Sequence, residues 1–283
     1  MIQSNPSISI LMPVYRPNLS WLKESLSSLA RQSYVKWKLI MSFDGVDELT
    51  DEASGLAISL LSKSNEVTIV KGEHVGIVGC LNRGLDFCDT TYTARMDVDD
   101  ICLESRFTKQ IKAFEEDSSL VACGTQIVAI DSSGNRLATR AHQYPVTEFK
   151  TLLIGSCFNT PFAHPTVVFR TDTAKMIGGY ADCRCMEDYD LGSRLSRVGT
   201  VKNLPSVELY YRIHSNQHSK KVRPRRSDLL STRLRYIETL KTKYGQELTL
   251  IALIPFILWL MSPTGEYLLR RTGGRIFALL RRH

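Results

Sequence analysis

Three aspartates within four residues form the most distinctive chemical group in this chain. They are Asp97, Asp99 and Asp100, in the segment Arg95-Met-Asp-Val-Asp-Asp100. Carboxylates crowded in this way repel one another, and a cation among them relieves the repulsion. Oxygen ligands suit the hard ions Mg²⁺ and Mn²⁺, which often bridge protein carboxylates to a diphosphate. The segment therefore indicates either a divalent-metal site or a solvated acidic loop.

A second acidic group, Glu187-Asp188-Tyr189-Asp190, opens a helix predicted over residues 187–197. Carboxylates in the first turn are stabilised by the helix dipole, so these residues could simply cap the helix. A carboxylate close to a substrate hydroxyl could instead act as a general base. Both interpretations stay open on the residues alone.

The first hundred residues alternate between predicted strands and helices. Short apolar runs that end at proline or acidic residues predict strands over residues 8–14, 37–43, 67–70 and 91–96. Helices are predicted between them, and this βαβαβαβ order indicates a parallel sheet covered by helices. Ligands of such sheets bind beyond the carboxyl ends of the strands. Tyr15, Asp44 and Asp97 are expected at that edge.

The element order changes after Asp100. We predict a helix over residues 104–116, then a hairpin whose first arm is 125–130 and whose turn is 132–135. Strands are predicted over residues 164–169 and 207–213, and a last helix over 227–244. A boundary near residues 214–219 separates a first domain, residues 1–218, from a basic helical tail, residues 219–283.

Seven segments in order along the chain resemble the motifs of the family 2 glycosyltransferases. The similarity runs from about residue 7 to residue 218. The segments are Ser9-Ile-Leu-Met-Pro-Val-Tyr15, Ser42-Phe-Asp-Gly45, Gly76-Ile-Val-Gly-Cys-Leu-Asn-Arg-Gly84, Arg95-Met-Asp-Val-Asp-Asp100, Phe162-Ala-His-Pro-Thr-Val-Val-Phe-Arg170 with Gly178-Gly-Tyr180, Glu187-Asp-Tyr-Asp-Leu191 and Tyr211-Arg-Ile-His-Ser215. The resemblance implies the α/β GT-A fold, a Rossmann-like, mostly parallel sheet with helices on both faces, followed by a C-terminal helical appendage. It also implies a nucleotide-sugar half, about residues 1–100, and an acceptor half, about 101–218.

The resemblance assigns a donor side to the site. Its expected contacts with a nucleotide-sugar, in particular a UDP-sugar, are Pro13, Val14, Tyr15, Asp44, Asn82 and Asp97. Val14 and Tyr15 would lie along the base, and Asp44 would accept a hydrogen bond from a uracil nitrogen. Asp99 would be the main protein ligand of Mg²⁺ or Mn²⁺. His214 would contact the metal or the diphosphate, unless it is an ordinary loop histidine.

The resemblance also assigns an acceptor side. Asp188 would be the general base, Glu187 would stand beside it as a second catalytic residue, and His164 would line the acceptor pocket or pack within its strand. Attack by the acceptor hydroxyl opposite the departing diphosphate would invert the anomeric carbon. The chain departs from the family pattern in Asp44-Gly45, where Asp-Asp is common, and in Gly192-Ser193, where bulky residues are common.

Charge is distributed unevenly along the chain. The last 72 residues hold 15 Lys and Arg against 4 Asp and Glu, whereas the preceding part is mildly acidic. Residues 248–261 form an uncharged apolar run, interrupted by Pro255 and shorter than the ~20 residues that a spanning helix needs. This pattern favours contact with an anionic membrane surface, with packing on the catalytic domain or in a dimer interface as the alternative. We therefore expect a cytoplasmic protein, peripheral on the inner face of a bacterial plasma membrane.

The expected reaction moves a sugar to a hydroxyl of a glycan or polyprenyl-linked acceptor in surface-polysaccharide synthesis. A metal-dependent nucleotidyl or phosphoryl transferase is one alternative, because such enzymes also use clustered aspartates. A nucleic-acid-binding protein is another, but the tail does not interleave aromatic with basic residues, so no nucleic-acid partner is predicted. No Gly-x-Gly-x-x-Gly follows the first strand, which disfavours a dinucleotide-binding dehydrogenase.

Overall fold

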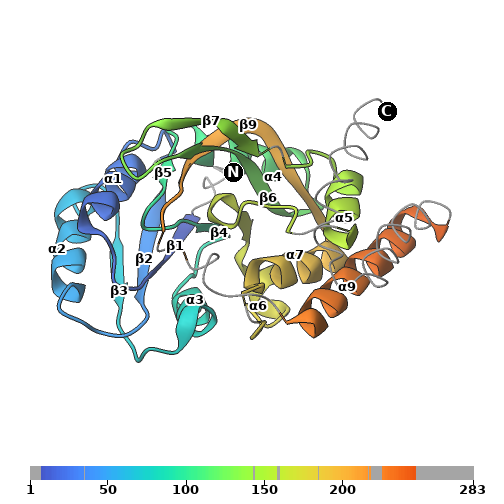
Figure 1. Ribbon diagram of the computed structural model, residues 1–283, viewed down its shortest axis with the longest axis horizontal. Coiled ribbons are helices and arrows are strands. Elements are labelled where there is room, and N and C mark those ends of the chain that lie inside the picture. Colours follow the sequence, from blue (N-terminus) through green and yellow to red (C-terminus); the bar gives the residue numbers. More distant parts are fainter. Residues whose placement is uncertain are drawn as a thin grey trace, which may run out of the picture.

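The computed structural model describes residues 8–34, 36–142, 144–157, 160–183, 185–215, 217 and 225–246. One nine-stranded sheet runs through this part in the order β3-β2-β1-β4-β8-β6-β9-β5, with β7 paired to β6 (Figure 1). The strands are β1 Ile8–Val14, β2 Trp37–Phe43, β3 Val67–Val70, β4 Tyr92–Arg95, β5 Ile101–Cys102, β6 Leu120–Ile130, β7 Arg136–His142, β8 Val168–Arg170 and β9 Thr200–Arg212. The helices are α1 Leu19–Ala30, α2 Thr50–Leu61, α3 Gly76–Asp86, α4 Arg106–Glu116, α5 Glu148–Cys157, α6 Thr171–Met176, α7 Glu187–Val198 and α9 Arg226–Tyr244, with a 3₁₀ turn, η1, at His164–Thr166.

The first half of the sheet is parallel, as the alternating pattern predicts. β1 pairs with β2 on one side and with β4 on the other, and β3 pairs with β2. Side chains of β1 alternate between two cores, because successive residues of a strand face opposite sides. Ile10 and Met12 pack in the core that α1 and α2 cover, whereas Leu11 packs in the core that contains α3. The carboxyl ends of these strands therefore meet at one edge between helices.

The second half of the sheet mixes the two strand directions. β8 is antiparallel to both β4 and β6, and β7 is antiparallel to β6, as the predicted hairpin requires. β9 is parallel to β6 and follows it from Thr200 to Arg212. Both strands are therefore longer than predicted, since pairing along their full length satisfies backbone groups that a short strand would leave open.

The strand predicted over residues 164–169 is only partly present. His164–Thr166 forms the turn η1, and β8 begins at Val168. The backbone N–H groups of Thr166 and Val167 donate to the carbonyls of Ala163 and His164, at 2.8 and 3.1 Å, instead of to a neighbouring strand. Pro165 has no N–H to contribute to a ladder, which favours the turn over the strand at this point.

The helix predicted at residues 227–244 is present as α9, and it packs against α5 and α7 at one end of the molecule (Figure 1). Tyr236 and Leu240 are fully buried in the core shared by these helices. The division of the chain at residues 214–219 remains a prediction. The apolar run at residues 248–261 lies outside the described residues. Within the described residues, no helix combines the length and apolar character that a membrane crossing requires.

Candidate active site

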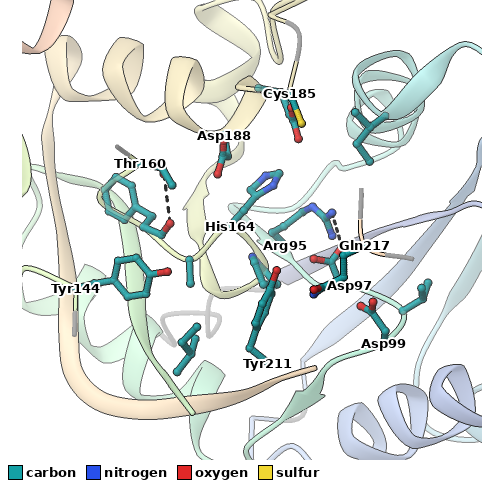
Figure 2. Close-up of a pocket in the computed structure, with 17 residues that line it drawn as sticks. Arg95, Asp97, Asp99, Tyr144, Thr160, His164, Cys185, Asp188, Tyr211 and Gln217 are labelled. Carbon is teal, nitrogen blue, oxygen red and sulfur yellow. Dashed lines mark hydrogen bonds and ion pairs between the residues drawn. The ribbon is translucent and has the colours of Figure 1, made fainter. Parts of the chain in front are cut away.

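Two cavities open side by side beyond the carboxyl ends of β1, β2 and β4. The first, of about 590 Å³, extends toward β1 and β2, and the second, of about 440 Å³, extends toward η1 and α7. Asp97 and Asp99 line both, so the acidic loop after β4 stands where the cavities meet. Figure 2 shows the second cavity, with Asp188 on one side and Asp97 and Asp99 on the other.

The first cavity gathers the residues predicted from the ends of β1 and β2. Pro13, Val14, Tyr15 and Asp44 all line it. Asp44 is buried, and its Oδ1 accepts hydrogen bonds from the backbone N–H groups of Val75 and Gly76, at 2.8 and 3.0 Å. This carboxylate therefore fixes the start of α3 against the end of β2.

His74, which the sequence analysis did not predict as a site residue, also lines the first cavity beside Tyr15 and Asp44. His74 Nδ1 lies 2.9 Å from Asp44 Oδ2, and its ring stacks on that of Tyr15, with 4.8 Å between centroids and 18° between planes. Both rings are more than half exposed, and both line the cavity. They give the first cavity a flat aromatic surface.

Asn82 occupies a different position from the one predicted. Its side-chain amide donates to the backbone carbonyl of Tyr180 and accepts from the backbone N–H of the same residue, each at 2.8 Å. It does not line the first or the second cavity. The paired bonds instead hold α3 to the segment that leads toward α7, so the structure gives Asn82 a bracing role and no support as a ligand contact.

Two arginines hold the acidic loop in place. Buried Arg95 donates from Nη2 to Asp97 Oδ1 at 2.6 Å. Arg212 is fully buried and donates from its backbone N–H to Asp100 Oδ1, and from Nε to the carbonyl of Asp99, both at 2.8 Å. Each arginine immobilises part of the loop while the carboxylate of Asp99 stays in the cavities.

His214 lies against Asp99 in the first cavity. His214 Nε2 lies 2.7 Å from Asp99 Oδ2, and the histidine ring packs against Trp21, with 4.8 Å between centroids. Asp99 and His214 both line the first cavity. An imidazole nitrogen and a carboxylate oxygen in contact form a pair of donors that a divalent ion can share.

The donor set of the acidic loop fits a hard divalent cation. Ligand oxygens of Asp97, Asp99 and Asp100 lie within 4.8 Å of one another. Burial, together with the charges of Asp99 and Asp97, raises the pKa of Asp100 well above its ordinary value. Asp100 Oδ2 is buried with no hydrogen-bond partner among the described residues. A cation beside these carboxylates would offset their burial and mutual repulsion.

The second cavity contains the acidic start of α7. Glu187 and Asp188 both line it, and Figure 2 shows the Asp188 carboxylate directed into the space. Burial raises the pKa of Asp188 to about 7, and the charge of Glu187 adds to that effect. A carboxyl group with this pKa exchanges a proton near neutrality, as a general base must. Asp188 Oδ1 also accepts a hydrogen bond from the backbone N–H of Tyr189 at 2.7 Å, so the carboxylate contributes to the start of α7 as well as lining the cavity.

His164 lies between the two acidic groups of the second cavity. Its Nε2 is 3.1 Å from the hydroxyl of Tyr180. Burial, and then the positive charge of Arg95, lower the pKa of His164 well below its ordinary value. Both effects favour the neutral form of the imidazole, and His164 lines the second cavity.

Comparison with known proteins identifies the family. The family model described as Glycosyl transferase family 2 matches residues 9–174, more than half of the chain. This chain belongs to that family. The amylovoran biosynthesis glycosyltransferase AmsE of Erwinia amylovora is 30% identical over 215 residues, which cover 75% of this chain and 79% of AmsE.

Solved structures place this glycosyltransferase in the GT-A fold, which confirms the predicted fold class. A structure of S. aureus TarS residues 1–349 in complex with UDP-GlcNAc matches with a TM-score of 0.62 at 16% identity, over 85% of this chain and 68% of that one. The mannosyltransferase PcManGT of Pyrobaculum calidifontis, in complex with GDP-Man and Mn²⁺, matches with a TM-score of 0.61 at 13% identity, over 98% and 81%.

Several residues of the glycosyltransferase site escaped the sequence predictions. Arg95 and Arg212 belong to motifs that also contain predicted site residues, so their position in the sequence could have identified them. Tyr144 and Tyr211 line the second cavity with aromatic rings. Tyr144 follows no motif and comes from a segment that has no regular structure in the sequence pattern, so the sequence offered no signal for it.

Proposed function

We propose that this glycosyltransferase moves a sugar from a nucleotide donor, in particular a UDP-sugar, to a hydroxyl of a glycan or lipid-linked acceptor. The reaction inverts the anomeric carbon and belongs to bacterial surface-polysaccharide synthesis, as the name of the relative AmsE suggests. One observation carries this proposal. A carboxylate cluster that fits a divalent cation and a carboxyl group whose pKa is about 7 lie on opposite sides of the second cavity.

The first cavity suits the nucleotide. Its aromatic wall, Tyr15 with His74, offers a stacking surface of the kind that a base occupies. Asp44 lies beside this wall, where its remaining lone pairs can accept a hydrogen bond from a base. The solved relatives that contain UDP-GlcNAc and GDP-Man support a nucleotide-sugar donor of this general kind.

The acidic loop suits Mg²⁺ or Mn²⁺, with Asp99 as the main ligand and Asp97 and His214 beside it. A bound divalent ion would neutralise the charge that grows on the departing diphosphate. Arg212 and Arg95 keep the carboxylates in a fixed arrangement, so little reorganisation is needed when donor and ion enter. Fixed charge of this kind is the usual source of electrostatic stabilisation in active sites.

The second cavity suits the acceptor. Tyr144 and Tyr211 provide apolar ring faces for a sugar, and Asp188 lies on the side away from the acidic loop (Figure 2). Asp188 takes the proton of the attacking hydroxyl, and the hydroxyl oxygen bonds to the anomeric carbon as the diphosphate leaves. Because attack and departure occur on opposite faces, the anomeric carbon inverts. Neutral His164 can orient a hydroxyl without adding charge.

A screen of nucleotide-sugars tests the proposal without an acceptor. We expect one donor, with Mg²⁺ or Mn²⁺ present, to raise the melting temperature more than the donor or the ion alone, and to be hydrolysed slowly. The Asp99→Ala variant should lose the difference between donor with metal and donor without it. Equal stabilisation with and without metal, in both proteins, would remove the metal from the mechanism.

We also propose that the basic tail holds the enzyme on the cytoplasmic face of the membrane. The proposal rests on the charge excess and the apolar run at residues 248–261. A chain truncated after residue 246 should bind UDP as the full chain does and should lose its binding to anionic vesicles in a sedimentation assay. A full-length chain that stays in the supernatant would favour packing of the run on the domain.

A further inference from the structure

The C-terminal helix α9 is joined to the catalytic helix α7 by charged contacts. Arg235 of α9 donates from Nη2 to Asp190 Oδ1 and from Nε to Ser193 Oγ, the latter at 3.0 Å. The other carboxylate oxygen of Asp190 accepts from Arg194 Nε at 2.6 Å. Asp190 is buried between the two arginines and is two residues from Asp188 along the first turn of α7.

An aromatic residue of α9 fills a notch made by two glycines. Tyr236 is fully buried, and its ring stacks on Tyr189 of α7, with 5.4 Å between centroids and 23° between planes. A Cβ atom added at Gly155 of α5 would lie 2.8 Å from the Tyr236 ring. One added at Gly192 of α7 would lie 2.8 Å from its hydroxyl oxygen. Both positions must therefore stay small for α9 to dock.

These contacts account for the small residues at Gly192 and Ser193. Gly192 provides the space that Tyr236 occupies, and Ser193 provides the hydroxyl that Arg235 binds. Tyr189 also donates a hydrogen bond to the carbonyl of Gly155, so α5, α7 and α9 form one packed group. Figure 1 shows these three helices together at the end of the molecule.

We propose that α9 is a positioning element for the acceptor base, acting through Arg235 and Tyr236. Asp188 and Glu187 are the first two residues of α7, and the α9 contacts hold the next turns of the same helix. A helix fixed at residues 189–193 presents its first turn to the cavity in one orientation. The inference rests on the proposed role of Asp188 and adds a part of the chain beyond the seven family motifs.

The proposal predicts a loss in transfer with no loss in donor binding. None of the described residues that line the first cavity belongs to α7 or α9, so nucleotide affinity should be unchanged when the contacts between these helices are broken. Displacement of a catalytic group by about 1 Å can cost up to ~10²-fold in rate. We therefore expect Arg235→Met to lower kcat by about 10–100-fold. The chain should still fold, because Arg194 continues to pair with Asp190.

The test combines hydrogen exchange with transfer kinetics in five variants of the full chain. Arg235→Met removes the charged contact, and Arg235→Lys restores a charge near Asp190. Gly192→Ala creates the clash with Tyr236, and the double variant Gly192→Ala/Tyr236→Phe removes the oxygen that the new methyl would meet. Lys241→Met is the matched control, because this α9 side chain is exposed.

We expect the amides of residues 189–194 to exchange about tenfold faster in Arg235→Met and Gly192→Ala, while those of β1 and β2 do not change. Arg235→Lys and the double variant should recover both slow exchange and transfer in part, and Lys241→Met should match the wild type. Unchanged exchange in Arg235→Met, or faster exchange with wild-type transfer, would overturn the inference. A wild-type chain that transfers no sugar would instead count against the proposed function, and exchange alone would then decide whether α9 orders α7.

Discussion

The two halves of the molecule build their parts of the site in different ways. The first cavity stands on parallel strands whose ends are set by local sequence, with Tyr15, Asp44 and Asp97 following β1, β2 and β4. The second cavity is assembled from η1, the start of α7 and segments around Tyr144 and Thr160, which come together only through tertiary packing. On the proposed roles, the regular sheet would position the cation and the nucleotide, whereas the acceptor base would depend on helices that pack against one another.

The difference extends to the electrostatics of the two groups of carboxylates. The acidic loop combines carboxylates with Arg95 and Arg212, which hold its geometry without filling the space among the side chains. Burial, and then the charge of Glu187, raise the pKa of Asp188 to about 7. In the acidic loop, burial and mutual repulsion raise the pKa values of Asp100 and Asp97, and a cation would offset both effects, whereas Asp188 has to exchange a proton with the acceptor in the proposed reaction.

The largest expected effect comes from removing the proton acceptor. Asp188→Asn keeps the size of the side chain and cannot take a proton, so transfer to the acceptor should fall by about 10²–10⁴-fold. Glu187→Gln should lower the rate less, because Glu187 acts mainly through the charge it places beside Asp188. Initial rates with saturating donor measure both. Asp188→Asn at close to the wild-type rate would move the role of base to Glu187, since Asp190 is occupied by two arginines.

The pH dependence of transfer should follow the same group. Below a pH of about 7, Asp188 is protonated and cannot accept the hydroxyl proton, so kcat should fall about tenfold for each further pH unit. Above that pH the rate should level off. Donor binding measured over the same pH range serves as the control. A kcat that does not change between pH 5 and 8 would show that protonation of Asp188 does not control the catalytic step.

Stability should change in the opposite direction from activity. The folded-state pKa of Asp188 is above its unfolded value of 3.8. Ionisation of this carboxyl group therefore lowers the free energy of unfolding, and the loss grows as the pH rises from about 4 to about 7. Asp188→Asn should therefore stabilise the fold at pH 8, on the order of 4 kcal/mol, and less at pH 5. Urea unfolding at both pH values measures this. Asp190→Asn, a matched change in the same turn, should destabilise the fold because it breaks a buried ion pair.

The smallest expected effect concerns the aromatic wall of the first cavity. Tyr15→Ala removes the ring that stacks on His74, and it should weaken UDP binding by about 3–10-fold, the usual value of one aromatic contact. Transfer at saturating donor should change little. Isothermal titration with UDP and Mn²⁺ measures the affinity, and Tyr144→Ala in the second cavity is the control that should leave it unchanged.

The sequence predicted the parallel half of the fold closely, because apolar runs, turn residues and caps are local signals. The side chain of Asn18, for example, accepts hydrogen bonds from the backbone N–H groups of Ser20 and Trp21, two and three residues further along the chain, at the start of α1. The acceptor half was harder to predict. The stretch at residues 164–169 has the composition of a strand, yet Pro165 and the hydrogen bonds of Thr166 turn it into η1. The sequence showed no clear helical period of apolar residues over α5 and α6.

The predicted site residues divide in the same way. Pro13, Val14, Tyr15 and Asp44 line the first cavity because each follows or ends a strand whose position is fixed by the sheet. Asn82 looked equally suitable as a contact, but its amide pairs with the backbone of Tyr180, a residue 98 positions away. Long-range pairing of this kind leaves no trace in a single sequence. The same is true of Arg235 and Tyr236, whose partners on α7 become visible only when α9 is docked.

The central claim is that the two cavities have separate roles, one in donor binding and one in proton transfer. Its most direct test is the dissociation constant of UDP, measured with Mn²⁺ in Asp188→Asn and Asp99→Asn. If the first cavity binds the donor and the second holds the base, Asp188→Asn should bind UDP within about twofold of the wild type. Asp99→Asn should bind at least ~10-fold more weakly and should lose the effect of the metal. Equal weakening in the two variants would contradict the account, because it would mean that both aspartates act on the nucleotide.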